Sequence, residues 1–146
     1  MRGMTIIVRK ITQLVAPVIF LYGLYIIVHG HLTPGGGFAG GVIMAGAFIL
    51  PILANGSILP NLRKEEAGLE LMESAAILGF LIIAGLGLLF SGSLIFFSNF
   101  LHKGILGKLV SAGFIPIENI VVGVEVCAAM TTIFIALTVF SEEVPK

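Results

Sequence analysis

Apolar residues occur in four long runs along the chain. The runs cover residues of about 11–28, 34–53, 74–90 and 117–140, and few polar residues interrupt them. A helix needs about 20 apolar residues to cross the hydrocarbon core of a bilayer. The pattern therefore predicts an all-α fold, a polytopic membrane protein whose four transmembrane helices form a single domain over residues 1–146.

Two polar stretches separate the later runs. Residues 55–66 contain turn residues and clustered charges, so we expect a connection there, after which Glu70 and Glu73 stand at the start of the third helix. Residues 91–116 mix phenylalanines with lysines and glycines. We interpret them as an interfacial segment with a helix that places its phenylalanines at the acyl boundary. A re-entrant segment is the alternative.

Basic residues predict the orientation of the helices. The side that holds both termini collects Arg2, Arg9, Lys10, Arg63, Lys64 and Lys146, whereas the other side collects only Lys103 and Lys108. The positive-inside rule places both termini in the cytoplasm. The basic start resembles a signal peptide, but the first run is too long for a signal core and no small-residue cleavage site follows it. We therefore expect a retained helix.

Composition agrees with a membrane location. Of the 146 residues 58% are hydrophobic and 11% are charged, with a mean hydropathy of +1.13, whereas a soluble domain carries about 25% charged residues. Eight basic and eight acidic residues give a net charge of zero, which argues against a nucleic-acid-binding surface. The single cysteine, Cys127, has no partner for an internal disulfide.

A glycine-rich stretch opens the second run. Residues 29–41 read His-Gly-His-Leu-Thr-Pro-Gly-Gly-Gly-Phe-Ala-Gly-Gly. Small residues let a neighbouring helix approach until the main chains nearly touch. The predicted helix carries them four apart in two adjacent rows, namely Gly37, Gly41 and Ala45, and Gly36 and Gly40. We expect another protein surface to pack on this face.

The residues before this helix predict how it starts. Thr33 is a suitable N-cap, and Pro34 at the first helical position loses nothing by lacking an N–H. The exposed amides of Gly35 to Gly37 are placed to attract an anion. No Lys-Ser/Thr pair follows the glycines, so the stretch is not a nucleotide-phosphate loop.

Three polar residues, Glu118, Glu125 and Thr132, recur every seven positions in the fourth run. Seven residues return a helix to nearly the same face, so they form one polar line with Glu125 well inside the membrane. A deep carboxylate is costly unless it is paired, protonated or facing water, and no lysine or arginine lies within the spans to pair it. Glu125 is therefore either part of a proton or cation route or a protonated group that hydrogen-bonds a neighbouring helix. A single deep acid is too little for transport by this chain alone, which favours a subunit.

Three histidines, His29, His31 and His102, lie on the predicted outer side. Their spacing is a weak signal for a metal, because no cysteine or aspartate completes the set. Hydrogen bonding or titration near neutral pH is the favoured role. The sequence contains no nucleophile–base arrangement and no ligand cluster, so we expect no cofactor, no metal and no enzyme activity of the chain on its own.

The glycine-rich stretch resembles the signature of the MnhB/MrpB family, the membrane subunits of Mrp-type Na+/H+ antiporters and of related modules in energy-converting respiratory complexes such as membrane-bound hydrogenases. The chain length, the four runs and residues 117–126 are also similar to that family. The resemblance implies a small subunit without a cofactor, in the cell membrane of a prokaryote, packed among other antiporter subunits and helping to form the path of sodium ions or protons. The family's motif falls on His31, Pro34, Gly35, Gly36, Gly37, Phe38, Gly40 and Gly41, and its carboxylates on Glu118 and Glu125.

Two main functions stay open on the sequence. In the first, the chain is a non-catalytic component of an Mrp-type antiporter module and its glycine face contacts larger subunits; the path candidates are Glu125, Glu118, Thr132, His31 and His29. In the second, it is an independent homodimeric transporter whose paired Glu125 side chains exchange protons for a cation or a drug. A purely structural subunit is a third reading. We favour the first, within an energy-converting complex, because the short ends leave little of the chain outside the membrane.

Overall fold

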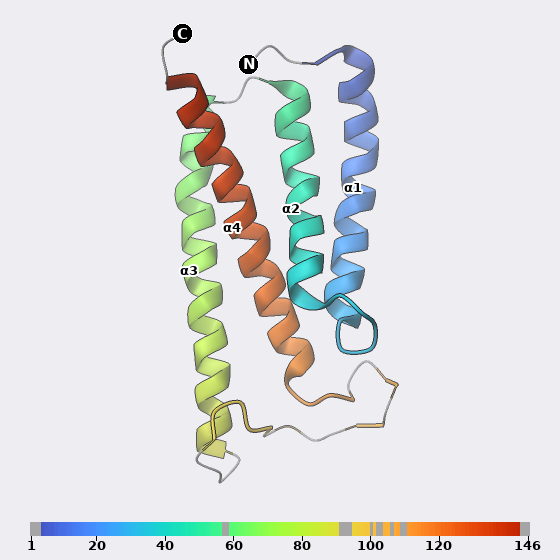
Figure 1. Ribbon diagram of the computed structural model, residues 1–146, viewed down its shortest axis with the longest axis vertical. Helices are drawn as coiled ribbons and strands as arrows, with labels where there is room; N and C mark the ends of the chain where they lie inside the picture. Colours follow the sequence, from blue (N-terminus) through green and yellow to red (C-terminus); the bar gives the residue numbers. More distant parts are fainter. Residues whose placement is uncertain are drawn as a thin grey trace.

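The computed structural model contains four helices that run alternately up and down (Figure 1). They are α1 (Ile6–His29), α2 (Gly36–Asn55), α3 (Leu59–Phe90) and α4 (Ile115–Glu143). The structure describes residues 4–56, 59–90, 95–99, 101, 104–105, 107–108 and 111–143, without the side chains of 59–66 and 140–143. Each helix contains 20 to 25 residues that are apolar enough to cross a membrane. The prediction of an all-α protein with four spans is confirmed.

Two helices extend further than the apolar pattern predicts. α1 begins at Ile6 rather than near residue 11, because the Thr5 hydroxyl caps it by accepting a backbone N–H at 3.5 Å. α3 includes residues 59–66, where we expected a connection. Lysine, arginine and glutamate are good helix formers, so the helix continues through this charged stretch. Its apolar part, Ala67–Phe90, is the portion able to cross a membrane.

The two glutamates of the third span lie well inside α3. Glu70 is exposed and Glu73 is half-buried. Because residues 59–66 precede them in the same helix, they are too far from its N-terminus to gain from the helix dipole, which acts within the first turn. The prediction that they stand at the start of the helix is wrong.

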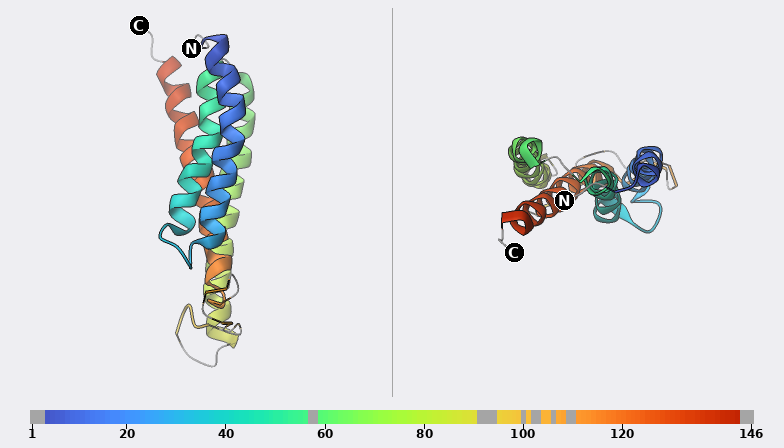
Figure 2. Two further views of the ribbon diagram at one scale, coloured as in Figure 1. Left: turned by 90° about the vertical axis from the view of Figure 1, so that its right-hand side faces the viewer. Right: turned by 90° about the horizontal axis from the view of Figure 1, so that it is seen from above.

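The helices stand in a single row, one helix thick (Figure 2). α1 packs against α2, α2 against α4 and α4 against α3, while α1 makes a smaller contact with α4. Among the described residues, the backbone of α3 does not come close to that of α1 or α2. α4 therefore joins two halves of the molecule, a pair of helices on one side and α3 on the other.

The two ends of this row differ in what they hold. We call the end where α1 begins and α4 finishes the termini end, and the opposite end the loop end (Figure 1). The loop end holds the glycine-rich connection between α1 and α2 and the start of α4. The first residues of α1 and the last residues of α4 lie at the same end, as expected for an even number of antiparallel helices.

A cluster of buried side chains lies where α1, α2 and α4 meet. Ile27, Met44, Ala45 and Cys127 form one cluster, in which Ile27 is 2% exposed and Ala45 is 1% exposed. Many leucine, isoleucine and phenylalanine side chains elsewhere on the helices are exposed. A soluble monomer rarely exposes so much apolar surface, whereas a surface in contact with lipid requires it. The core cluster belongs to one half of the row, and none of its four members comes from α3.

The segment after α3 turns back along that helix. Phe97 donates its N–H to the Ala84 carbonyl at 3.5 Å, and the ring centroids of Phe97 and Phe80 are 5.4 Å apart. The described part of the segment holds no helix, so the interfacial helix that we expected is not found there. The contact between Phe97 and Ala84 favours the re-entrant alternative, which stays a prediction. Residues 91–94, 100, 102–103, 106 and 109–110 of this segment lie outside the described residues.

Candidate functional site

Glycines at the start of α2 bring three helices into backbone contact. A Cβ placed on Gly41 would lie 2.7 Å from the carbonyl oxygen of Gly123 in α4, and one on Gly40 would lie 2.8 Å from that of Gly23 in α1. Side chains essentially never approach other atoms so closely, so glycine alone fits without a shift of the helices. The two rows predicted from the sequence therefore face different helices: Gly37 and Gly41 face α4, and Gly40 faces α1.

Ile27 of α1 occupies the space that two of these glycines leave. Its side chain lies against the positions of a Cβ on Gly40 and on Gly123. Gly23 accommodates the side chain of Met44 in the same way. Sequence reasoning missed Gly23, Ile27 and Gly123. Isolated glycines inside otherwise apolar runs were the signal that would have found two of them.

The glycine contact lies within the chain itself. The expectation that another protein packs on this face is wrong, because α1 and α4 already cover it. Ala45 belongs to the neighbouring core cluster. Phe38 points elsewhere and is 65% exposed, and a Cβ on Gly46 would have no neighbour within 4 Å. The surface of α2 that is left for a partner is this outward side.

The start of α2 is capped from another helix. The helix begins at Gly36, after Gly35 with a φ of 144°, and no side chain from its own start caps it. The Thr33 hydroxyl instead donates to the His29 carbonyl at 3.1 Å, so the predicted Thr33 cap is wrong. Gly37 donates its N–H to Oδ1 of Asn119 in α4 over 3.4 Å.

Asn119 is therefore a site residue that the sequence analysis passed over. Its side chain also lies 3.1 Å from the position of a Cβ on Gly30, at the end of α1. One amide thus touches the ends of two helices from a third. Because it occupies the Gly37 amide, one of the three N–H groups that we expected to attract an anion already has a partner. An asparagine beside Glu118 in an apolar run was the available sign.

Glu125 lies in the seam between α3 and α4. It lines a small cavity of about 180 Å³ together with Ala76, Ile77, Phe80, Val121 and Val122. The side chain is half-buried, and it has no hydrogen bond or ion pair among the described residues. The walls of this cavity are otherwise apolar, so nothing in them satisfies a carboxylate.

Glu118 shares this face of α4. Residues 118, 121, 122 and 125 follow the helical spacing of one stripe, so Glu118 lies on the α3 side, two turns nearer the loop end. Its Oε1 atom is buried and has no partner among the described residues. The two carboxylates are therefore the polar groups of an apolar seam, able to take up a proton or a cation, or to bind a donor from another chain.

The two threonines further along α4 bond to their own helix. Thr132 donates its hydroxyl to the Ala128 carbonyl at 3.0 Å, and the buried Thr131 donates to the Cys127 carbonyl at 2.7 Å. Threonine commonly satisfies its hydroxyl in this way inside a helix. The Thr132 oxygen keeps its lone pairs, so it still offers an acceptor.

His29 and His31 lie at the loop end. His29 donates from Nδ1 to the Tyr25 carbonyl at 3.1 Å and stacks on the Tyr25 ring, with centroids 4.2 Å apart. His31 reaches the Lys108 carbonyl with Nε2 at 3.4 Å, while its Nδ1 is buried without a partner among the described residues. The described part of the chain contains no group of three or more histidine, cysteine, aspartate or glutamate residues that could hold a metal; His102 lies outside it.

Comparisons with known proteins agree on one family. Residues 7–132 match the family model described as a domain related to the MnhB subunit of Na+/H+ antiporter. An uncharacterized protein of Methanocaldococcus jannaschii is 37% identical over 114 residues, which make up 75% of this chain and 43% of that protein. A protein of Staphylococcus aureus strain Newman named "Putative antiporter subunit mnhB2" is 43% identical over 54 residues, 37% of this chain and 38% of that protein.

A solved structure is similar over nearly the whole chain. It is described as the membrane-bound sulfane sulfur reductase (MBS), an archaeal respiratory membrane complex, and it matches with a TM-score of 0.74 at 33% identity, covering 93% of this chain and 61% of that chain. This chain spans about two fifths of the length of the curated relatives it matches. The family match extends over most of the four apolar helices. The chain therefore belongs to the family of domains related to the MnhB subunit of Na+/H+ antiporters, and it is a multi-pass prokaryotic membrane protein.

Proposed function

We propose that the chain is a membrane subunit of an Mrp-type antiporter module, in which it helps to form the route of sodium ions or protons and carries out no redox chemistry itself. The family match and the name of the Staphylococcus aureus relative support the antiporter module. The similarity to a chain of an archaeal respiratory membrane complex supports a place in an energy-converting assembly.

The observation that carries this proposal is the position of Glu125. Glu125 lines an apolar cavity near the middle of a membrane-spanning helix, and its carboxyl group has no partner among the described residues. An ionised carboxylate is costly at that depth. It is stabilised there by a proton, by a cation or by a charged group from a neighbouring subunit, and each of these makes the residue part of a route or an interface.

Glu118 and the loop end extend the route toward one membrane surface. Two turns of helix, a rise of about 10 Å, separate Glu118 from Glu125, and His31 lies beyond, at the same end as the start of α4. By the positive-inside rule we expect this end to lie outside and the termini end to lie in the cytoplasm. The proposed route therefore runs from the outer surface past Glu118 to Glu125.

Ion exchange by the assembled complex tests this role. In inverted membrane vesicles, we expect Glu125→Gln to lower Na+/H+ exchange by about tenfold, because the amide cannot take up a proton or neutralise a cation. Glu70→Gln, an equal substitution at an exposed position of α3, is the matched control and should leave exchange unchanged. Normal exchange in a normally assembled Glu125→Gln complex would leave the chain only a structural role.

Purification in mild detergent tests the assembly itself. We expect other antiporter subunits, and subunits of a redox enzyme, to co-purify with the chain. A chain that purifies alone and exchanges ions in liposomes would contradict the proposal and would support the independent homodimeric transporter.

A further inference from the structure

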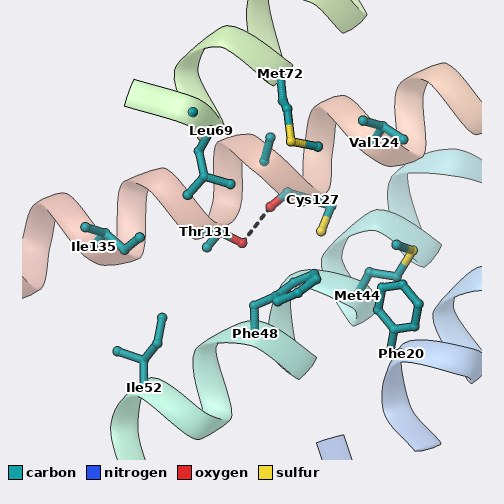
Figure 3. Close-up of a pocket in the computed structure, with 12 residues that line it drawn as sticks. Phe20, Met44, Phe48, Ile52, Leu69, Met72, Val124, Cys127, Thr131 and Ile135 are labelled. Atoms are coloured by element: carbon teal, nitrogen blue, oxygen red, sulfur yellow. Dashed lines mark hydrogen bonds between the residues drawn. The ribbon is translucent and has the colours of Figure 1, made fainter. Parts of the chain in front are cut away.

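A large apolar cavity lies between α2 and α3, with α4 as its floor (Figure 3). Its volume is about 650 Å³. Phe48 and Ile52 project from α2, Leu69 and Met72 from α3, and Ile135 from α4 (Figure 3). The cavity exists because the backbones of α2 and α3 do not approach each other, and it is separate from the small cavity at Glu125.

The lining offers an occupant no free hydroxyl donor. The single hydroxyl, that of Thr131, donates to the Cys127 carbonyl at 2.7 Å (Figure 3). The remaining lining side chains are aliphatic, aromatic or sulfur-containing. A ligand with hydrogen-bonding groups would therefore lose its hydration here without compensation, whereas a hydrocarbon chain would lose nothing.

We propose that this cavity binds an acyl chain of a membrane lipid from the leaflet at the termini end. The lining of α4 extends from Val124 to Ile135, about 16 Å along the helix axis at 1.5 Å per residue. One leaflet contributes about half of a hydrocarbon core that is about 30 Å thick. The cavity thus has about the depth of one leaflet. Its lining in α4 spans the middle of that helix, but its lining in α3, from Gly68 to Met72, lies at the end of the apolar span Ala67–Phe90 that is nearest the termini end.

The cavity is also continuous with the surface that already faces lipid. Phe48 and Met72 stand on its two sides and are 49% and 50% exposed. A chain from the adjoining bilayer can therefore enter sideways without crossing a polar barrier. The proposal does not depend on the ion route.

Gly68 gives a way to fill the cavity without disturbing the helices. It belongs to the lining, and a Cβ placed on it would have no neighbour within 4 Å. Gly85, in the same helix, also has no neighbour within 4 Å but lies outside the lining. Gly68→Leu and Gly85→Leu are therefore a matched pair, the same substitution with and without an effect on the cavity.

Photocrosslinking to a lipid probe tests the proposal. Membranes containing the complex are loaded with a phosphatidylcholine that carries a diazirine on one acyl chain, solubilised in mild detergent, washed free of loose lipid and then irradiated. We expect label on Leu69, Met72 or Cys127, unchanged in Gly85→Leu and reduced by about fivefold in Gly68→Leu, because the added side chain takes up the cavity volume.

Two results would overturn the proposal. One is equal labelling of the cavity residues in Gly68→Leu and Gly85→Leu complexes that contain the same amount of folded chain. The other is a photoreactive amino acid at position 48 that crosslinks to a polypeptide and not to lipid, because a protein segment would then fill the space. Loss of ion exchange in Glu125→Gln has no bearing on either result, so the two proposals fail separately.

Discussion

The two halves of this row of helices are packed in opposite ways. Where α2 meets α1 and α4, glycines oppose each other and a Cβ on Gly40 or Gly41 would lie within 2.8 Å of a backbone oxygen. Where α3 meets α4, the nearest atom to a Cβ on Gly79 is 3.9 Å away, and Gly68 and Gly85 have no neighbour within 4 Å. Glycine is present on both sides, but only on one side does it bring helices into close contact; Gly87 of α3 is close to the backbone of Ser98, in the segment after that helix.

The difference shows that small residues pack one half of the subunit closely, while the other half keeps space between its helices. Without a hydrophobic drive between helices in lipid, close backbone contact is a main source of attraction, so the α1–α2–α4 half forms a fixed unit. The α3 side keeps space between helices, and both the Glu125 cavity and the larger apolar cavity lie against α3. The candidate sites occur where the packing is loose.

Breaking the tight half should have the largest effect. We expect Gly41→Leu to destabilise the chain by about 3 kcal/mol or more, because its side chain would meet the Gly123 carbonyl and Val126, and neither can move without the helix. The readout is the yield of folded chain in size-exclusion chromatography. Gly46→Leu, in the same helix but with open space around it, should give a normal yield; a normal yield of Gly41→Leu would show that the backbones do not touch.

Removing the side chain of α4 that caps α2 should have a moderate effect on the stability of the same half. Asn119→Ala deprives the Gly37 amide of its acceptor, and the loss of a capping hydrogen bond costs about 1 kcal/mol. Unfolding in increasing SDS measures this cost. Asn119→Asp keeps an acceptor oxygen and adds a negative charge at a helix N-terminus. We therefore expect its stability in SDS to stay close to that of the unchanged chain. An equal loss in both variants would argue against the cap.

A substitution in the loose half should be nearly silent. Gly85→Leu adds a side chain into open space, so we expect a change within about 0.5 kcal/mol in the same SDS experiment. If Gly85→Leu instead destabilised the chain as strongly as Gly41→Leu, the contrast between the two halves would be false.

The smallest effect is expected at the boundary between the halves. Thr131→Val replaces a hydroxyl that bonds only to its own helix with a methyl group of similar size, so the change in stability should be below about 0.5 kcal/mol. A larger loss would mean that the Thr131 oxygen serves a group outside the described residues. The thermal midpoint of the purified complex would detect it.

The apolar pattern predicted the number and kind of helices but not their ends. It missed the extension of α3 over residues 59–66, because charged residues form helix readily once they leave the membrane. It also assigned the N-cap of α2 to Thr33, since local sequence cannot reveal an acceptor on another helix. Asn119 supplies that acceptor from 82 positions away along the chain.

The sequence identified residues of the candidate site but not where they lie between the helices. The seven-residue spacing predicted that Glu118 and Glu125 lie on one face of α4. It did not predict which neighbouring helix that face contacts. The glycine rows were found, yet their partners were expected in another protein. Periodicity along one helix defines its faces, whereas the choice of the helix that covers each face depends on all four at once.

The sequence by itself determined that this protein is a four-helix membrane protein with an acid deep in its last span, because the cost of placing polar groups in hydrocarbon acts on each segment separately. The tertiary structure alone decided that α1 and α4 close over the glycines, that α3 stands apart from α2, and that the acid faces the gap beside α3. These are properties of helix pairs, and they follow from which backbones can approach each other most closely.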